Sequence, residues 1–305
     1  MKILITGGAG YKGILLTEKL LELGHEVTII DNFMYGCEPV LHLANKENLN
    51  ILRLDMRNIK KKDIVPYDVI YHLAGISGVP ACAANPSSAG SINVEATRKL
   101  VEATEKEQIL INASTTSFYG ASGKAFDEEM PVEPISLYGE TKYVAEEIVQ
   151  QRENSVSLRF ATIFGVSPRM RNDLLVNDFV YKAMTEGVIV LYAGQSRRTF
   201  VHVRDAVTAY LFVLDNVSAM RGRIFNVGAD HLNFSKLEIA KLIKKFVKCE
   251  VIDSSLPTQD KRDFIVSFDK IHKIGYKTIY SLEEGVRELV RLYSYYKIHS
   301  HYNVI

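Results

Sequence analysis

The sequence predicts an α/β protein in which a doubly wound parallel sheet is followed by a smaller C-terminal α/β domain. Two observations predict this fold. Short apolar runs alternate with helical patterns through the first half of the 305 residues, which is the order of a parallel sheet with crossover helices. A glycine-rich turn also joins the first apolar run to the first helical pattern. Such a turn places backbone groups at the carboxyl edge of the sheet.

Six apolar runs in the first half are expected to be strands, because they are continuous rather than alternating, as in strands that helices cover on both faces. The runs are 1–5, 27–31, 50–54, 69–73, 109–113 and 156–160. The helical patterns between them include 14–21, 89–106 and 138–151. Ligands of such a Rossmann sheet bind at the carboxyl ends of its strands. The residues at those ends are Gly7, Asp31, Asp55, Ala74 and Thr115.

The turn after the first strand has the pattern of a phosphate-binding loop. Gly7 and Gly8 permit a tight turn that side chains would block. Gly10 lets the backbone approach a pyrophosphate, and Gly13 lets the helix pack close to the strand. The helix N-terminus offers unpaired N–H groups and the positive end of a dipole to the anion. The alternative is a tight turn that binds no ligand.

The second strand ends in an acid, Asp31, at the separation from the glycine turn that a dinucleotide site requires. A carboxylate there accepts hydrogen bonds from the adenosine ribose and repels a 2′-phosphate. The sequence therefore predicts NAD as the cofactor in preference to NADP.

The pattern changes after residue 165. A polar stretch at 168–173 is expected to be a loop, followed by an amphipathic helix over about 174–186. The runs 200–203 and 224–227 are expected to return to the edge of the first sheet. We therefore assign residues 1–167 and about 199–232 to the dinucleotide-binding domain. Residues 168–198 and 233–305 are assigned to a smaller substrate-binding domain.

Composition excludes several classes of protein. Lys plus Arg total 37 and Asp plus Glu total 36, so no net field favours nucleic acid or an anionic membrane as partner. Three scattered cysteines suggest neither disulfides nor a metal site, and they fit the reducing cytoplasm. The eight histidines lack ligand spacing, so no metal is expected. Because the first strand is expected to begin at residue 2, no signal peptide is expected, and no apolar stretch in the sequence is long enough to span a bilayer.

A helical pattern that begins near residue 138 carries Tyr138 and Lys142, four residues apart and therefore on one helix face. A tyrosine with an ordinary pKa near 10 is a poor base at neutral pH, but a neighbouring ammonium lowers that value. The run from Thr115 to Ser117 adds hydroxyl groups at a strand end. Together these groups suit oxidation of a sugar alcohol. The alternative is a surface tyrosine beside a solvated lysine.

At this point the chain resembles the extended short-chain dehydrogenase/reductases, in particular the nucleotide-sugar epimerases and dehydratases. Besides the glycine turn and YxxxK, the resemblance rests on motifs at 72–75, 93–94, 158–165, 198–205 and 226–228. It implies Tyr138 as the catalytic base, Lys142 as its partner and Thr115 as the catalytic hydroxyl. The cofactor-binding residues that it implies are Gly7, Gly10, Tyr11, Lys12, Gly13, Asp31, Asn32, Asp55, Met56, Leu73, Ala74, Gly75, Asn93, Tyr138 and Lys142.

The predicted substrate-binding residues are Ser77, Thr116, Thr162, Arg198 and Arg262. The resemblance implies the two arginines, Thr162 stands where many relatives carry an Asn, and Ser77 is predicted from its place beyond a strand end. Arginine suits a nucleotide diphosphate because its planar fork pairs with phosphate oxygens. For Arg198 and Arg262 the alternative is an exposed loop charge, and for Ser77 a hydroxyl that faces water. For Lys12 the alternative to a cofactor contact is a side chain that points to solvent from the first helical turn.

Dehydratases of this family carry a carboxylic acid directly after the catalytic Thr or Ser. Thr116 and Ser117 occupy these places here, which argues against 4,6-dehydration. The sequence therefore predicts an NAD-dependent nucleotide-sugar epimerase acting at C4. The alternatives are a keto-sugar reductase or dehydrogenase of the same fold, and a non-catalytic dinucleotide-binding protein. Relatives form dimers, so a homodimer is expected through the helices near 89–106 and 138–151.

Overall fold

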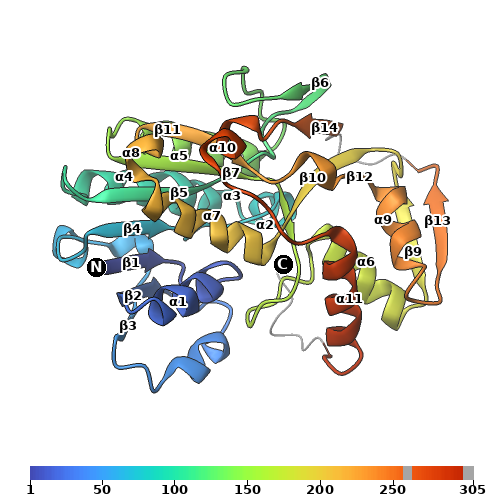
Figure 1. Cartoon of the computed structure of the whole chain (residues 1–305), viewed down its shortest axis with the longest axis horizontal. Helices are drawn as coiled ribbons and strands as arrows, with labels where there is room; N and C mark the ends of the chain where they lie inside the picture. The colour runs from blue at the N-terminus through green and yellow to red at the C-terminus, as the bar shows by residue number, and fades with distance from the viewer. Residues whose placement is uncertain (257–262, 298–305) are drawn as a thin grey trace.

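A seven-stranded sheet forms the centre of the first domain in the computed structural model, which describes residues 1–256 and 263–297 (Figure 1). The strand order is β11-β7-β5-β4-β1-β2-β3, and all neighbouring strands run parallel. The strands are β1 (Lys2–Thr6), β2 (Glu26–Asp31), β3 (Leu49–Arg53), β4 (Val69–His72), β5 (Ile109–Thr115), β7 (Ser155–Phe160) and β11 (Arg223–Val227). All six strands expected in the first half are present, and the predicted fold class is confirmed.

The helices of this domain connect the strands and pack against the sheet. They are α1 (Gly13–Glu22), α2 (Val79–Ala84), α3 (Pro86–Ala89), α4 (Ala96–Ala103), α5 (Leu137–Gln150), α7 (Val203–Asp215) and α8 (Val217–Met220). Four elements are short 3-10 helices, namely η1 (Glu38–Leu43), η2 (Met56–Asn58), η3 (Lys61–Asp63) and η5 (Asp230–Leu232), and η4 (Gly90–Glu95) is a π-helix. The helix expected over 89–106 is therefore interrupted, since η4 is π-helical. Helix α5 begins where the Ser136 hydroxyl accepts a hydrogen bond from the Gly139 N–H.

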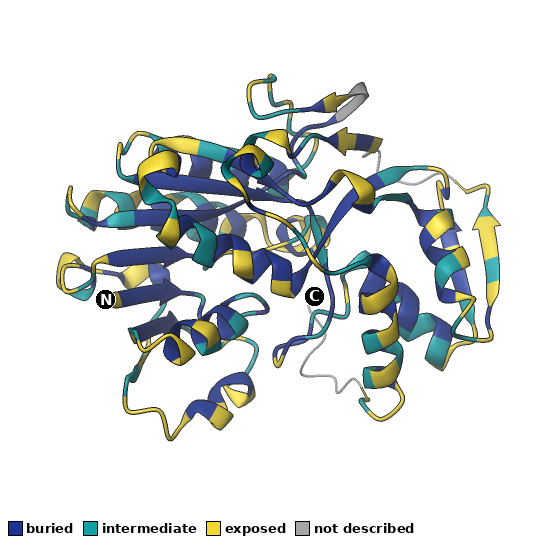
Figure 2. Ribbon diagram, in the orientation of Figure 1, coloured by how far each residue is buried: buried dark blue, intermediate teal, exposed yellow. Residues whose placement is uncertain are grey.

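Burial explains why the central strands have continuous apolar sequences. Every residue of β4 and β7 is buried, whereas the edge strand β3 alternates between half-buried and exposed positions. Figure 2 shows the central strands as an almost unbroken dark layer under the helices. A strand that helices cover on both faces has no side that polar residues could occupy.

A second, smaller domain has its own apolar core. It contains α6 (Leu175–Thr185), β9 (Val188–Tyr192), α9 (Lys236–Ile243), β13 (Glu250–Ser254) and α11 (Leu282–Tyr293). Figure 1 shows these elements gathered at one end of the molecule, on the right. Val180, Ile189, Ile239 and Leu289 are buried together there, in a cluster separate from the core of the large sheet.

One predicted strand pairing is wrong. The run 224–227 joins the main sheet as β11, but 200–203 does not. It belongs to β10 (Arg197–His202), which pairs with β8 (Thr162–Phe164) and β12 (Asn233–Ser235) in a separate three-stranded sheet. The edge beside β7 is already occupied by β11, and β8 carries the chain away from that edge directly after β7.

The buried clusters depart from the proposed domain division in two places. Phe164, Phe200, Ala229 and Leu232, assigned to the first domain, are buried in the core of the second, and the other departure lies near the C-terminus. β14 (Asp263–Val266) pairs with β6 (Ala121–Phe126), and α10 (Asp269–Ile274) follows it. Phe264, Phe268 and Ile271 are buried in the core of the large sheet, although residues 233–305 were assigned to the second domain. Otherwise the division stays a prediction. No helix within residues 1–256 and 263–297 has the length and apolar character to cross a membrane.

Candidate active site

The glycine turn after β1 forms a close-packed loop. Gly7 has a φ of +72°, and a Cβ on it would lie 2.8 Å from the backbone nitrogen of Ala74 at the end of β4. A Cβ on Gly13 would collide with the carbonyl oxygen of Gly7. Both positions therefore require glycine, and the loop is drawn down between the ends of β1 and β4.

This loop leaves backbone donors available at the start of α1. The N–H groups of Tyr11 and Lys12 donate to no residue that the structure describes. Unpaired N–H groups at a helix N-terminus are a binding site for phosphate. The cradle therefore fits the pyrophosphate of a dinucleotide.

The residues predicted to hold the adenosine end lie together beyond β2 and β3. The Asp31 carboxylate accepts hydrogen bonds from the N–H groups of Ala9 and Phe33 at 3.1 Å and 2.8 Å, and burial raises its pKa. Asn32 Nδ2 lies 3.5 Å from the Asp55 carboxylate. A bidentate pair with Arg57 lowers the pKa of Asp55 to about 2, so this carboxylate is ionised at neutral pH.

Met56, also predicted to bind the cofactor, has its side chain directed away from the site. Its side chain is buried in a cluster with Leu4, Ile30 and Ile70, because the residue begins the short turn η2 with its side chain under the sheet. Its backbone is left for the predicted cofactor contact, which stays a prediction.

Asn93 holds the loop after β4 against α5. Its Oδ1 accepts from the Ile76 N–H at 2.8 Å, while its Nδ2 donates to the Ile76 carbonyl at 3.0 Å and to Thr141 Oγ1 at 3.1 Å. A Cβ on Gly75 would lie 2.9 Å from Asn93 Oδ1. The segment 73–75, which is predicted to bind the cofactor, is therefore held beside the glycine turn.

The proposed catalytic residues come from β5 and the first turns of α5. Thr115 ends β5, is buried, and accepts a hydrogen bond from the Ser117 N–H at 3.1 Å. The Tyr138 hydroxyl has no hydrogen-bond partner among the residues described here, so it is available to a ligand. Lys142 lies one turn further along α5 and is 9% exposed.

Burial lowers the pKa of Lys142 to about 8, and the negative charge of Glu146 partly opposes this shift. His72 lies between the hydroxyls of Thr6 and Thr97, at 2.8 Å from each. Burial and the charge of Lys142 lower the pKa of His72 to about 3. At neutral pH His72 is therefore uncharged, whereas Lys142 is mostly protonated.

The residues predicted to contact substrate are only partly brought together. Ser77 is exposed, and its Oγ accepts from Arg171 Nη1 at 3.0 Å, so its hydroxyl is linked to the loop after β8. Thr162 is half-buried at the start of β8. Thr116 is turned inward, where its hydroxyl donates to the Phe160 carbonyl at 3.2 Å. A main-chain acceptor at the end of β7 thus takes the proton of this hydroxyl, and the substrate contact of Thr116 stays a prediction.

The two predicted phosphate-binding arginines have different outcomes. Arg198 is not an exposed loop charge: it lies in β10, is 3% exposed, and its guanidinium is 5.6 Å from the centre of the Phe264 ring. Arg262 lies outside the described residues.

The alternative given for Lys12, a side chain that points to solvent, is wrong. Its side chain does not point to solvent: Nζ lies 4.1 Å from the centre of the Phe160 ring and 5.4 Å from that of Tyr210. No local sequence signal pointed to Tyr210, because it is one of several apolar positions along α7. The link between Arg171 and Ser77 was equally invisible, since it joins residues 94 positions apart.

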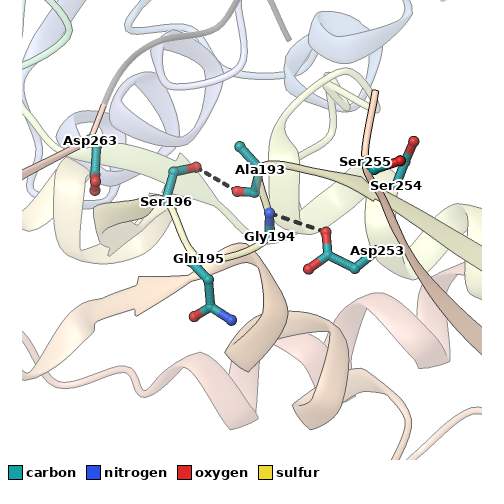
Figure 3. Close-up of a pocket in the computed structure, with 8 residues that line it drawn as sticks. All are labelled: Ala193, Gly194, Gln195, Ser196, Asp253, Ser254, Ser255 and Asp263. Atoms are coloured by element: carbon teal, nitrogen blue, oxygen red, sulfur yellow. Dashed lines mark hydrogen bonds between the residues drawn. The ribbon is translucent and has the colours of Figure 1, made fainter. Parts of the chain in front are cut away.

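A hollow in the second domain is separate from these residues. Ala193, Gly194, Gln195 and Ser196 line it, together with Asp253, Ser254, Ser255 and Asp263 (Figure 3). Figure 3 shows the Asp253 carboxylate accepting from the Gly194 N–H, at 3.3 Å. The two carboxylates disfavour an anionic ligand, so we do not assign the catalytic site to this hollow.

Comparison with known proteins agrees with this arrangement. The model of the NAD dependent epimerase/dehydratase family matches residues 3–228. An uncharacterized UDP-glucose epimerase of Bacillus subtilis is 32% identical over 80% of this chain and 81% of its own length. UDP-glucuronic acid decarboxylase 1 of Danio rerio is 30% identical over 96% of this chain and 72% of its own.

A solved structure with a similar fold is UDP-glucuronic acid 4-epimerase from Bacillus cereus, in complex with UDP-glucuronic acid and NAD. It superposes with a TM-score of 0.85 and 25% identity, over 96% of this chain and 99% of that one. The resemblance seen in the sequence and the predicted cofactor, NAD, are thereby confirmed. The family model covers the glycine turn, the end of β5 with Thr115, and α5 with Tyr138 and Lys142. The chain therefore belongs to the NAD dependent epimerase/dehydratase family.

Proposed function

We propose that this protein is an NAD-dependent epimerase of a nucleotide-activated sugar, acting at C4. The observation that carries the proposal is the combination of Thr115, Tyr138 and Lys142 with the hydroxyl residues Thr116 and Ser117. The first three residues supply what alcohol oxidation needs. The last two leave no carboxylic acid next to Thr115 for the elimination of water.

In the proposed cycle Tyr138, as the phenolate, accepts the proton of the C4 hydroxyl. The C4–H bond breaks and its electron pair leaves with the hydrogen as hydride, so that C4 becomes a carbonyl. When bound, NAD would supply the acceptor for this hydride, and inversion requires that the hydride be delivered to the opposite face of C4 in the same turnover. Tyr138 then returns its proton to the oxygen. The Lys142 ammonium stabilises the phenolate, and Thr115 donates a hydrogen bond to the sugar oxygen.

The named relatives support a UDP-sugar as substrate, either a hexose or a hexuronic acid. Arg198, buried on β10, suits the diphosphate. Arg262 remains a second predicted contact. Arg171 lies near Ser77 at the sugar side of the site but is already paired with Asp173, so it does not by itself select a charged sugar.

The test is incubation of the purified protein with UDP-glucose, UDP-glucuronic acid and their GDP, CDP and dTDP counterparts, with products identified by NMR. The expected result is inversion at C4 with no net change in NADH absorbance. Net consumption of NADH with a keto-sugar would instead show a reductase.

A second candidate is decarboxylation of a UDP-hexuronic acid, which the relative from Danio rerio supports. Oxidation at C4 makes the sugar a β-keto acid, which loses CO2 readily. A pentose product together with CO2 from UDP-glucuronic acid would show this activity in place of epimerisation.

We also propose a homodimer formed through the helices near 89–106 and 138–151. The exposed Val144 on α5 supports an apolar contact there, and twofold dimers are the commonest assembly. Sedimentation at micromolar concentration tests this. A cytoplasmic location is supported by Cys37, Cys82 and Cys249, which are all unpaired.

A further inference from the structure

Lys12 is a half-buried lysine beside the proposed active site. It directly precedes α1 in the glycine turn, and its side chain runs inward. Nζ lies over the Phe160 ring at the end of β7 and faces the Tyr210 ring on α7. Aromatic faces attract a cation, but they do not replace a counter-ion.

The surroundings of this amine contain no negative charge that pairs with it. Lys12 Nζ forms no hydrogen bond or ion pair with any residue in 1–256 or 263–297. The charged groups that act on it are Lys142 on α5 and Arg171 after β8, both cations. The remaining polar group is the buried Tyr210 hydroxyl, which itself lacks a hydrogen-bond partner within those ranges. The pKa of Lys12 is lowered well below its ordinary value. Burial is the largest cause, and the charges of the two cations add to it.

The position of the amine relates it to the nicotinamide end of the cofactor. In the sheet, β4 and β5 lie between β1 and β7. Nζ of Lys12 lies over the ring of Phe160 at the end of β7, and Phe160 is the register partner of Thr115 at the end of β5. Thr115 ends β5, and the hydride acceptor must lie against Thr115 and Tyr138. The amine of Lys12 therefore lies beside the strand ends at which the hydride site is proposed.

We propose that Lys12 makes the choice between oxidised and reduced cofactor depend on pH, because its ammonium form disfavours the cationic nicotinamide of NAD⁺ and tolerates the neutral ring of NADH. The inference rests on the NAD site of the proposed function. Two like charges in an enclosed site repel far more than in water. Protonation of Lys12 therefore favours retention of NADH until the hydride returns to the sugar.

The test compares four proteins: wild type, Lys12→Met, Lys12→Arg and Lys19→Met. Methionine has a similar length and no charge, arginine stays protonated, and Lys19 is an exposed lysine of the same helix, paired with Glu22. The dissociation constants of NAD⁺ and of NADH are measured by calorimetry from pH 6 to 10 on protein freed of cofactor. Lys142 titrates in this range but is present in all four proteins, so differences between them report Lys12.

In wild type and Lys19→Met, the ratio of the NAD⁺ to the NADH dissociation constant is expected to rise as pH falls, by up to about tenfold per pH unit below the pKa of the amine. Lys12→Met loses this rise, and Lys12→Arg keeps a high ratio at every pH. If Lys12→Met retains the wild-type dependence, the inference is wrong although the cofactor site stands. If Lys12→Met does not fold, a high and pH-independent ratio in Lys12→Arg supports the inference, and a wild-type profile overturns it. If wild type binds neither dinucleotide, the proposed function itself fails.

Discussion

Glu146 and Arg159 form an ion pair that is almost completely buried. Arg159 Nη2 lies 2.7 Å from Glu146 Oε1, and Arg159 Nε lies 3.1 Å from both carboxylate oxygens. Arg159 Nη1 also donates to the Tyr119 hydroxyl at 2.7 Å, which in turn donates to Asn226 on β11. The pair therefore ties α5, one turn beyond Lys142, to β7 and β11. It sets the position of the helix that carries Tyr138.

We expect Glu146→Gln to lower the free energy of unfolding by about 3–5 kcal/mol, because the Arg159 charge would remain buried without a partner. Urea denaturation followed by circular dichroism measures this loss. Glu147→Gln, at an exposed position of the same helix, is the control and should change little. Equal stability of the two variants would contradict a structural role for the pair.

Replacing Tyr138 by Phe should reduce kcat by about 10²–10⁴-fold, which is the usual contribution of a positioned acid–base group. NAD affinity should stay within about twofold of wild type, since the phenyl ring remains. The control is Tyr143→Phe, on the same helix, where the ring packs against Phe118. If Tyr138→Phe kept most of its rate, another group would have to take the proton.

The pH profile of kcat/KM should show an alkaline limb near pH 8. Lys142 has a pKa of about 8, so above this pH it loses its proton and no longer stabilises the Tyr138 phenolate. Lys142→Arg should move the limb to higher pH, because a guanidinium stays protonated. An unchanged limb in the arginine variant would assign it to a different group.

Cofactor preference should depend on Asp31. We expect Asp31→Asn to weaken the preference for NAD over NADP by about fivefold or more, because two unit charges 4 Å apart repel by about 1 kcal/mol even in water. The amide still accepts a hydrogen bond from the N–H of Ala9 or Phe33. Affinities for both dinucleotides, measured by calorimetry, test this. An unchanged ratio would show that Asp31 does not face the ribose.

Lys12→Met should stabilise the cofactor-free protein at low pH by about 1–3 kcal/mol, since holding a charged amine without a counter-ion in a largely apolar environment costs roughly this amount. The pKa of Lys12 is lowered on folding, so the unfolded chain binds more protons between the folded and unfolded pKa values. The gain should thus be largest at low pH and disappear as pH rises past the ordinary lysine pKa. Thermal unfolding across this range, with Lys19→Met as reference, checks the sign. A gain that grows with pH would contradict it.

The sequence alone determined the structural features that depend only on residues close together in the chain. The glycine turn, the acid that ends β2, the continuous strands, and the spacing of Tyr138 and Lys142 each follow from local backbone conformation and the period of one helix or strand. These features were sufficient to predict the doubly wound sheet, the family and NAD.

Only the tertiary structure decided where side chains point once distant segments meet. It paired β10 with β8 rather than with the main sheet. It also turned the Thr116 hydroxyl toward the main-chain carbonyl of Phe160 and placed Lys12 Nζ over the Phe160 ring. It also joined Arg171 to Ser77. These contacts depend on long-range packing among segments far apart in the chain, for which a single sequence carries no periodic signal. Strand ends and motifs are local properties of the chain, whereas the environment of each reactive group is a property of the packed fold.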